Sequence, residues 1–317
     1  MRVLVTGGAG FIGSHLVDAY LGRGDKVLVV DDFSTGSEKN LEEALTRGLV
    51  IEKVSILDPK VQNLIKDFDP HLINHHAAQK SVRDSVENPI RDLKTNVEGL
   101  LNILGVAKSL ADLKRIIFAS SGGVMFGDEA PLPTPESYPE TPSSPYGISK
   151  LASEHYLRFF APSLNLKAVA LRYANVYGPR QDPLGEAGVV AIFSEKMLKG
   201  EATRVFGDGN QTRDFVYVAD IVEANLRAET IEDSFSVFHI GSGLQTSVNE
   251  LHREMSEIEG MSGIAGYQLK PEYAESRVGE QMRSCLDASS FAKRTAWAAR
   301  TDIQVGLKLT IDYFRSK

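Results

Sequence analysis

The chain has 317 residues, of which 42% are hydrophobic and 24% are charged, the proportions of an ordinary globular domain. Lysines and arginines number 35 against 42 acidic residues, so the formal charge is −7. An acidic chain is a poor candidate for binding nucleic acid or an anionic membrane surface. No apolar run approaches the roughly 20 residues that cross a bilayer, and we predict no membrane span.

Cysteine usage and the start of the chain bear on where the protein works. Cys285 is the one cysteine, so no internal disulfide can form, which fits a reducing compartment. The opening residues, MRVLVTGGAG, enter a strand-and-turn pattern at once, and we expect no signal peptide. We therefore predict a cytoplasmic protein.

Short apolar runs alternate with longer amphipathic stretches through the first 175 residues. We predict strands at 2–6, 26–31, 50–56, 71–77, 115–120 and 167–174. Helices are expected between them, including 11–22, 89–110 and 146–160. Strands that are apolar on both faces are typical of a parallel sheet covered by helices on both sides. The prediction is an α/β fold with a doubly wound parallel-sheet domain of the Rossmann type, residues 1–175.

The alternation weakens beyond residue 175. Helices at 188–199 and 219–228 are mixed with short strands such as 236–240. We interpret residues 176–317 as a smaller α/β substrate-binding lobe, interleaved with the first domain. Six of the 13 prolines lie between 131 and 145, just before the predicted helix at 146. Such a stiff loop is either a site wall or a plain connection.

A glycine-rich turn follows the first predicted strand and opens the first predicted helix. In the motif TGGAGFIG, Gly7 permits the tight turn, Gly10 lets backbone N–H groups approach a pyrophosphate, and Gly13 lets the helix pack closely. We place Phe11 and Ile12 in the same site. The start of the helix adds partial positive charge. This pattern predicts a dinucleotide site.

Acidic residues near the ends of the next two strands complete that prediction. Asp31 ends the second strand, where its carboxylate can accept hydrogen bonds from the adenosine ribose. It would repel a 2′-phosphate, which favours NAD over NADP; Asp31 and Asp32 could instead simply begin a polar loop. Asp58, at the end of the third strand, either bonds the adenine amine or caps a helix before Pro59.

Tyr146 and Lys150 lie four residues apart in SPYGISK and share one face of the predicted helix. An ammonium beside a phenol lowers the pKa of the phenol from about 10, and a nearby NAD⁺ would lower it further. We therefore predict Tyr146 as a general base for a sugar hydroxyl, with Lys150 also reaching the nicotinamide ribose. No metal site is predicted.

Seven features in this order resemble the extended short-chain dehydrogenase/reductase family, and within it the UDP-glucose 4-epimerase branch. They are TGGAGFIG, Asp31, Asn96, the FASS strand end, SPYGISK, LRYANVYGPR and TRDFVYVAD. The resemblance implies NAD-dependent epimerisation of a UDP-sugar. Tyr146 would remove the 4-hydroxyl proton while hydride leaves C4 for NAD⁺; the 4-keto sugar would turn over, and hydride would return to its other face. The resemblance further implies that NAD contacts a second group of residues, namely Ala77, Gln79, Asn96, Ser120 and Tyr173.

One position departs from the family pattern. The family usually has a Ser or Thr where this chain has Gly122, and Phe126 replaces a tyrosine. Ser121 is the nearest substitute for the hydroxyl that positions the sugar 4-oxygen, and we assign it that role beside Tyr146. Water is the alternative, in which case Ser120 and Ser121 merely finish the strand.

The resemblance also implies residues on the substrate side. Arg213 and Arg277 would bind the diphosphate, and Asn175 would bond the nucleotide phosphate. Glu280 stands where the family usually has Asp, facing a uridine ribose hydroxyl. The uracil would lie between two further residues, which fit the lobe core equally well: Val189 and Phe206.

Ser284 falls on the family position that limits room beside sugar C2. A small residue there resembles epimerases that also accept 2-acetamido sugars, so we expect both UDP-glucose/UDP-galactose and UDP-GlcNAc/UDP-GalNAc as substrates. By the same resemblance, helices 89–110 and 146–160 would pair across a two-fold axis into the four-helix bundle of a homodimer. Their apolar residues could instead cover only the sheet.

Other functions compete with this reading. A sugar 4,6-dehydratase would need an Asp-Glu pair where Gly122 and Gly123 stand. A UDP-glucuronate 4-epimerase or decarboxylase differs only in sugar-pocket residues. An NAD-sensing module that is not an enzyme would not need the Tyr146–Lys150 pair.

Overall fold

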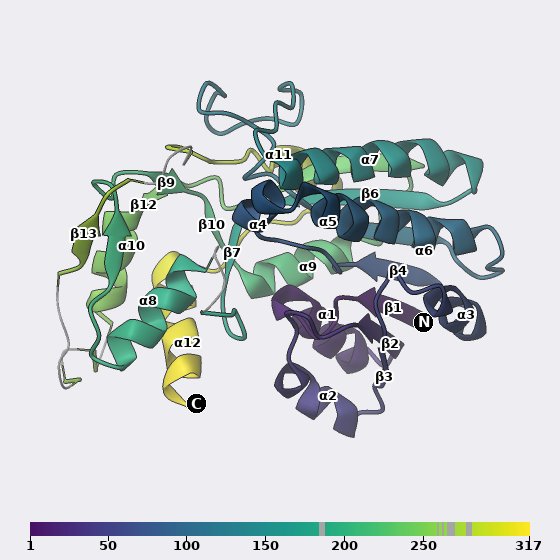
Figure 1. Cartoon of the computed structure of the whole chain (residues 1–317), viewed down its shortest axis with the longest axis horizontal. Helices are drawn as coiled ribbons and strands as arrows, with labels where there is room; N and C mark the ends of the chain where they lie inside the picture. Colours follow the sequence, from purple (N-terminus) through teal and green to yellow (C-terminus); the bar gives the residue numbers. More distant parts are fainter. Residues whose placement is uncertain (184–187, 259, 262, 265–269, 277–280) are drawn as a thin grey trace.

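The computed structural model describes the chain except for residues 184–187, 259, 262, 265–269 and 277–280. Its centre is a sheet of seven parallel strands in the order β11-β6-β5-β4-β1-β2-β3 (Figure 1). The strands are β1 Arg2–Thr6, β2 Lys26–Asp31, β3 Val50–Lys53, β4 Leu72–His75, β5 Arg115–Ser121, β6 Lys167–Tyr173 and β11 Phe235–Ile240. Six of the seven were predicted as strands of this sheet, although β3 and β4 are shorter than expected. The seventh, β11, was predicted as a short strand of the lobe, but it pairs with β6 at the edge of the central sheet.

Helices cover both faces of this sheet, which confirms the doubly wound α/β fold. One face packs against α1 Phe11–Gly22, α2 Glu42–Thr46, α9 Val218–Ala228 and α11 Ser289–Thr295. The other lies against α3 Lys60–Phe68, α6 Gly99–Ala107 and α7 Pro145–Ser163. Alternate side chains of each strand enter the two cores; in β1, Val3 and Val5 face α1 while Leu4 faces the α3 side.

The predicted helix at 89–110 is divided. A short α4, Val82–Glu87, precedes α5, Pro89–Leu93, and a π-helical turn at Lys94–Glu98 (η2) joins α5 to α6. The turn contains Asn96, whose side chain is bonded to the loop after β4. Such turns recur at functional sites because the extra residue redirects side chains, and periodicity alone did not reveal this one.

The lobe consists of helices and three two-stranded sheets (Figure 1, left). Its helices are α8 Val189–Leu198, α10 Val248–Ser256 and α12 Ile303–Arg315, and they share one apolar core. The paired strands are β7 Asn175–Tyr177 with β10 Phe215–Tyr217, β9 Thr212–Arg213 with β12 Thr246–Ser247, and β8 Arg204–Phe206 with β13 Glu272–Ala274. The division of the chain at residue 175 stays a prediction.

The strand order reverses between β1 and β4, because β1 is followed in space by β2 on one side and β4 on the other. In open parallel sheets, ligands bind outside the carboxyl ends of the strands at this point. The Thr6 hydroxyl and His75 Nδ1, at the ends of the two strands, are 2.7 Å apart. Among the described residues, no helix has both the length and the apolar character of a membrane span.

Candidate active site

The glycine turn sits at this switch point. Gly7 has φ +69°, and a Cβ there would lie 2.6 Å from the backbone nitrogen of Ala77. Helix α1 begins at Phe11, its preceding residue Gly10 provides no capping side chain, and its first turn holds no acid. A Cβ on Gly13 would lie 2.2 Å from the Gly7 carbonyl oxygen. The exposed positive end of α1 therefore fits a pyrophosphate.

Asp31 is tied to this turn. Its two carboxylate oxygens accept hydrogen bonds from Ala9 N at 2.9 Å and Phe33 N at 2.8 Å. Burial raises the pKa of Asp31, and these two bonds lower it. Because a carboxylate has about four lone-pair sites, acceptor capacity remains for a ribose hydroxyl. Asp32 accepts from Ser34 N at 2.9 Å, as in a polar turn.

We predicted that Asp58 lies at the end of the third strand, but β3 already ends at Lys53. Its carboxylate accepts from Lys60 N at 2.9 Å, so it bonds the start of α3. It also lines a cavity of about 440 Å³ with six other residues, Glu52, Lys53, Val54, Lys60, Asn63 and Leu64. Both interpretations of Asp58 therefore remain compatible with its position.

The structure brings Tyr146, Lys150 and Ser121 together. Ser144 caps α7 by accepting from Gly147 N at 3.2 Å, and Pro145 fills the first helical position. Lys150 Nζ lies 5.8 Å from the centroid of the Tyr146 ring and donates to the Ala119 carbonyl at 2.9 Å. The Ser121 hydroxyl, at the end of β5, lies near enough to the phenol of Tyr146 to lower its pKa.

The predicted lowering of the Tyr146 pKa is not what this geometry gives. Burial, together with the charge of Asp92, raises the pKa of Tyr146 to about 12, and the Ser121 hydroxyl only partly opposes this. Burial also lowers the pKa of Lys150 to about 8. The desolvation of both groups outweighs the effect expected from their spacing.

Asp92 is a site residue that sequence reasoning missed. It is completely buried on α5, and its carboxylate accepts from Ser149 Oγ at 2.6 Å, Asn96 Nδ2 at 2.9 Å and Gln79 Nε2 at 3.0 Å. Asn96 in turn exchanges two hydrogen bonds with the backbone of Gln79. The predicted residues Asn96 and Gln79 thus lie in one network that joins the loop after β4 to α7. The position of Asp92, four residues before Asn96 on a helix, was the available signal.

A second buried carboxylate lies one helical turn beyond Lys150. Glu154 accepts from Ser120 Oγ at 2.6 Å and from Arg172 Nε at 2.9 Å and Nη2 at 2.6 Å. Arg172 is only 2% exposed and also bonds Glu140 at 2.6 Å. The Ser120 hydroxyl therefore belongs to the Glu154 network, whereas the Ser121 hydroxyl lies near the Tyr146 phenol.

The two remaining predicted cofactor residues lie at neighbouring strand ends. Ala77 N donates to the Thr6 hydroxyl at 3.3 Å, beside the glycine turn. The Tyr173 ring stacks on His76 with centroids 6.1 Å apart, and its hydroxyl is bonded to Asn225. Burial, followed by the charge of Lys150, lowers the pKa of His76 to about 3, so this imidazole is neutral.

Residues 281–287, which we call the strap, pack against the SSGG turn through Leu286. A Cβ on Gly122 would lie 2.3 Å from Leu286 Cδ1 in the strap. Leu286 is buried, so the side chain that the family usually has at this position would displace it. This packing gives a physical reason for glycine at 122, and the hydroxyl that reaches Tyr146 comes from Ser121 instead.

The strap is fixed by residues distant in sequence. Ser284 is 5% exposed, and its N–H donates to the Thr212 carbonyl at 3.2 Å. The buried Asp214 accepts from Leu286 N in the strap at 3.2 Å, and also from the backbone N–H groups of Ser242 and Gly243. Asp214 is a second residue that sequence reasoning missed.

The other predicted substrate residues are spread around this region. Arg213 is in β9, next to Asp214, and Asn175 Oδ1 would lie 3.8 Å from a Cβ on Gly123. Val189 begins α8 and Phe206 ends β8. Two predicted residues lie outside the described part of the chain: Arg277 and Glu280.

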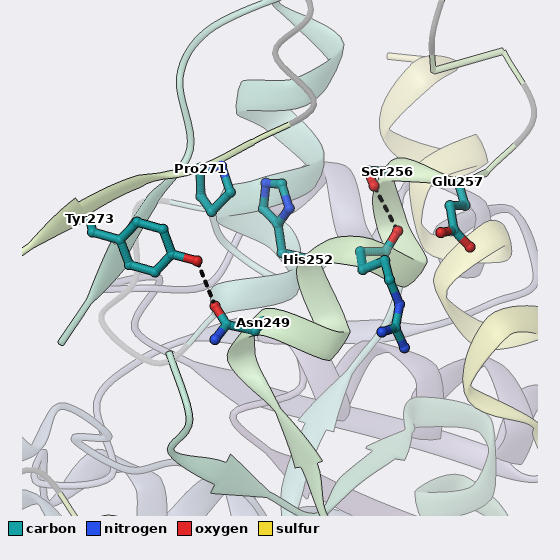
Figure 2. A pocket seen from close by; sticks show the side chains of 7 residues that line it. Asn249, His252, Ser256, Glu257, Pro271 and Tyr273 are labelled. Atoms are coloured by element: carbon teal, nitrogen blue, oxygen red, sulfur yellow. Dashed lines mark hydrogen bonds between the residues drawn. The ribbon is translucent and has the colours of Figure 1, made fainter. Parts of the chain in front are cut away.

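A further hollow, of about 260 Å³, lies in the lobe between α10 and β13 (Figure 2). Its lining comprises Asn249, His252, Arg253, Ser256, Glu257, Pro271 and Tyr273. The Tyr273 hydroxyl donates to Asn249 Oδ1 at 3.0 Å. These residues include none that the sequence pointed to, so this hollow is separate from the predicted site.

Comparison with known proteins agrees with this geometry. The model of the NAD dependent epimerase/dehydratase family matches residues 3–241. The chain belongs to the NAD-dependent epimerase/dehydratase family. A UDP-glucose 4-epimerase from Mycolicibacterium smegmatis is 41% identical over 318 residues, covering 100% of this chain and 99% of that protein.

Two solved structures in this family are similar over nearly their whole length. The UDP-glucose 4-epimerase of Thermotoga maritima with UDP-glucose has a TM-score of 0.92 and 45% identity, covering 100% of this chain and 99% of that one. The UDP-N-acetylglucosamine 4-epimerase of Methanobrevibacter ruminantium, in complex with UDP-N-acetylmuramic acid, has a TM-score of 0.91 and 33% identity, covering 99% and 98%. NAD is the cofactor of this family.

Proposed function

We propose that this chain is an isomerase, an NAD-dependent 4-epimerase of UDP-hexoses. The observation that carries the proposal is that Tyr146 lies beside both Lys150 and Ser121, at the sheet edge where the glycine turn and Asp31 prepare a dinucleotide site. The similarity to UDP-glucose 4-epimerases over the full chain supports the same reaction.

In this mechanism the protein holds the sugar and moves one proton. Gly7, Gly10 and the start of α1 would bind the pyrophosphate, and Asp31 the adenosine ribose. When bound, NAD supplies a hydride acceptor and a positive charge beside the phenol. Tyr146 takes the proton of the sugar 4-hydroxyl, and Ser121 positions the 4-oxygen.

Lys150 is the source of positive charge that belongs to the protein itself. With a pKa of about 12, the Tyr146 phenol is protonated at neutral pH, so a base role requires that pKa to fall when the site fills. The ammonium of Lys150 favours the phenolate because opposite charges attract strongly in a buried site. A pKa of about 8 leaves Lys150 mostly charged at neutral pH.

We propose that the nucleotide is held by residues of the lobe. Arg213 and Arg277 would bind the diphosphate through the planar donor fork of arginine, and Asn175 a phosphate oxygen. The remaining contacts, to the uridine, are proposed for Val189, Phe206 and Glu280.

Ser284 sets the proposed sugar range. A small side chain beside C2 leaves room for a 2-acetamido group, so both UDP-galactose and UDP-GalNAc should be epimerised. In Ser284→Tyr, the N-acetyl sugars should be lost selectively while UDP-galactose turnover is kept; Ser284→Thr is the matched control. Equal loss of both sugars in the tyrosine variant would contradict this assignment.

We also propose a homodimer built through the helices outside the sheet. Exposed apolar side chains gather on α4, α5 and α7, which contact one another: Val82, Val86, Ile90, Leu93, Ile148, Tyr156 and Phe159. Contiguous apolar surface of this kind marks an association site. Phe159→Asp should give a monomer in sedimentation experiments, whereas Leu309→Asp, equally an exposed apolar position but on α12, should not.

The proposed location is the cytoplasm. The lone Cys285 is buried and needs no oxidising compartment. Cell fractionation checks this point.

The reaction itself is tested by incubating the purified protein with UDP-galactose, UDP-GalNAc and UDP-glucuronate and following each by NMR. We expect the 4-epimers of the first two sugars. Loss of water or of carbon dioxide, or NAD binding without turnover of any sugar, would overturn the proposal.

A further inference from the structure

Asp92 is a buried carboxylate within the catalytic network that the proposed reaction does not use. It has no solvent exposure, and the three side chains that donate hydrogen bonds to it, from Ser149, Asn96 and Gln79, are all neutral. A buried carboxylate is costly unless it is hydrogen-bonded and its charge is balanced. The three donors supply the hydrogen bonds, and a cation is required to balance the charge.

The bonds made by the neighbouring carboxylate, Glu154, indicate which cation balances the charge of Asp92. Glu154 and Asp92 both act electrostatically on Lys150. Glu154, however, already holds the guanidinium of Arg172 through two hydrogen bonds of 2.9 and 2.6 Å. Asp92 instead bonds Ser149, the residue directly before Lys150 in α7. Lys150 is only 3% exposed, and it is the cation whose charge lowers the pKa of Asp92.

We propose that Asp92 is the buried counter-ion of Lys150 and a positioning residue for the Tyr146–Lys150 pair. The proposal rests on the catalytic roles proposed above for those two side chains. Through Ser149 the carboxylate fixes the first turns of α7, and through Gln79 and Asn96 it ties that helix to the loop after β4. The negative charge of Asp92 would in this way determine both the positions and the protonation states of Tyr146 and Lys150.

The directions of the pKa shifts agree with this arrangement. The charge of Asp92 raises the pKa of Lys150, against the larger effect of burial, and also raises the pKa of Tyr146. In return, Lys150 lowers the pKa of Asp92, which burial raises. Removing the negative charge should therefore lower the pKa values of both Tyr146 and Lys150.

The other groups facing Lys150 come from three elements. Glu154 on α7 is paired with Arg172 on β6, and neither depends on Asp92 for a bond. His75 ends β4 and His76 follows it; each pKa is about 3, so both imidazoles stay neutral across the working range. Because the charges of these neighbouring groups do not change, a shift in the pH profile of an Asp92 variant can be attributed to Asp92.

Asp92→Asn in the holoenzyme is the central test. In a bell-shaped profile of kcat/KM, the acid limb reports ionisation of Tyr146 and the alkaline limb reports loss of the proton from Lys150. Both limbs should move to lower pH by about one unit, the size expected for a unit charge at close range in a protein site. Ser149→Ala removes a hydrogen bond but keeps the carboxylate, so its limbs should stay in place while the rate falls modestly.

A second readout does not require turnover. With tyrosine labelled at the ring carbon that bears the hydroxyl, NMR follows phenolate formation, and the Tyr146 signal among the ten tyrosines is the one that Tyr146→Phe removes. Tyr146 should ionise at lower pH in Asp92→Asn than in the parent. Unmoved limbs and an unmoved titration would overturn the proposal. A parent that turns over no UDP-sugar would instead count against the proposed function, because the titration is still measurable.

If Asp92→Asn does not fold, Lys150→Met tests the same pair from the other side. Without the ammonium, the folded-state pKa of Asp92 should rise further above its unfolded value. A raised folded pKa gives stability at low pH that is lost as pH rises. The thermal midpoint of Lys150→Met should therefore fall further below that of the parent at pH 8 than at pH 5. An equal deficit at both pH values would overturn the pairing.

Discussion

The carboxyl edge of the sheet and the strap above it are held by different kinds of contact. At the edge, strands of four to seven residues pair in parallel register, and their side chains enter two continuous cores. The strap, residues 281–287, is instead held by isolated bridges to Thr134 and Thr212 and by individual hydrogen bonds to residues far away in the chain. Asp128 accepts from Met282 N at 2.8 Å, and Asp214 accepts from Leu286 N at 3.2 Å. The residues proposed for the chemistry lie at the sheet edge, and Ser284, the proposed sugar contact, lies in the strap.

This difference implies two kinds of defect. Changes at the edge should lower kcat with little effect on the fold, because the scaffold there is supported from both faces. Changes at the strap should raise KM and lower stability together, because isolated bridges and individual hydrogen bonds hold the segment proposed to face the sugar. The variants below separate the two.

The largest effect is expected for Tyr146→Phe. The change removes the phenol proposed to exchange the 4-hydroxyl proton, and a positioned acid–base group contributes about 10²–10⁴-fold to a rate. We expect kcat for UDP-galactose to fall about 10³-fold with KM and thermal midpoint near those of the parent. Tyr156→Phe, an exposed tyrosine on the same helix, is the control. Parent-like turnover in the Tyr146 variant would remove the basis of the mechanism.

Asp214→Asn tests the strap. The carboxylate accepts bonds from Leu286, Ser242 and Gly243, and an amide in its place would turn N–H groups toward these donors. A buried bond to a charged group is worth about 1.5–3 kcal/mol, so unfolding should become easier by at least about 2 kcal/mol. KM for UDP-sugars should rise more than kcat falls.

The exposed Asp208 is the matched control, since Asp208→Asn alters a lobe carboxylate that bonds only the local turn at Asn210. Denaturant unfolding measures the stability of both variants, and steady-state kinetics measures their KM and kcat. A kcat defect in Asp214→Asn with unchanged KM would contradict the distinction between edge and strap.

The same contrast explains how much could be predicted from the sequence. The sheet was predictable because runs such as VLVV in β2 are both the local signal for a strand and the cause of its burial. Tyr146 and Lys150 were predictable because four-residue spacing on a helix places them together. Their pKa values were not, because desolvation depends on what packs around them, which spacing does not contain.

Asp92 and Asp214 show the remaining limit. The spacing of Asp92 to Asn96 was a weak signal that the two share a helix face, but only the assembled fold reveals that Asp92 and Asp214 are buried. The departure at Gly122 likewise appeared to be a missing hydroxyl, whereas its cause is the packing of Leu286, which is 164 positions further along the chain. Contacts of that range leave no periodic signal in a single sequence.

Gly122→Ala tests the point where the two regions meet. Its Cβ would lie 2.3 Å from Leu286 Cδ1, so the buried Leu286 side chain of the strap must move. Overpacking a buried position costs about 1–3 kcal/mol, and KM should rise because the displaced segment carries Ser284. Five residues beyond Gly122, Gly127→Ala meets nothing within 4 Å and should leave both stability and KM unchanged. Equal behaviour of the two variants would show that Leu286 yields freely.

The smallest effect is expected for Ser121→Ala, which takes one hydroxyl from the edge without disturbing the strap. A neutral hydrogen bond contributes about 1 kcal/mol, so kcat should fall roughly fivefold to tenfold while KM stays near the parent value. Because the Ser121 hydroxyl lowers the pKa of Tyr146, the acid limb of the pH–rate profile should also move upward, opposite in sign to the shift expected for Asp92→Asn. Ser120→Ala is the informative contrast, since that hydroxyl bonds Glu154 and its loss should reduce stability rather than move the limb. A limb that moves in Ser120→Ala and not in Ser121→Ala would reassign the hydroxyl that faces the phenol.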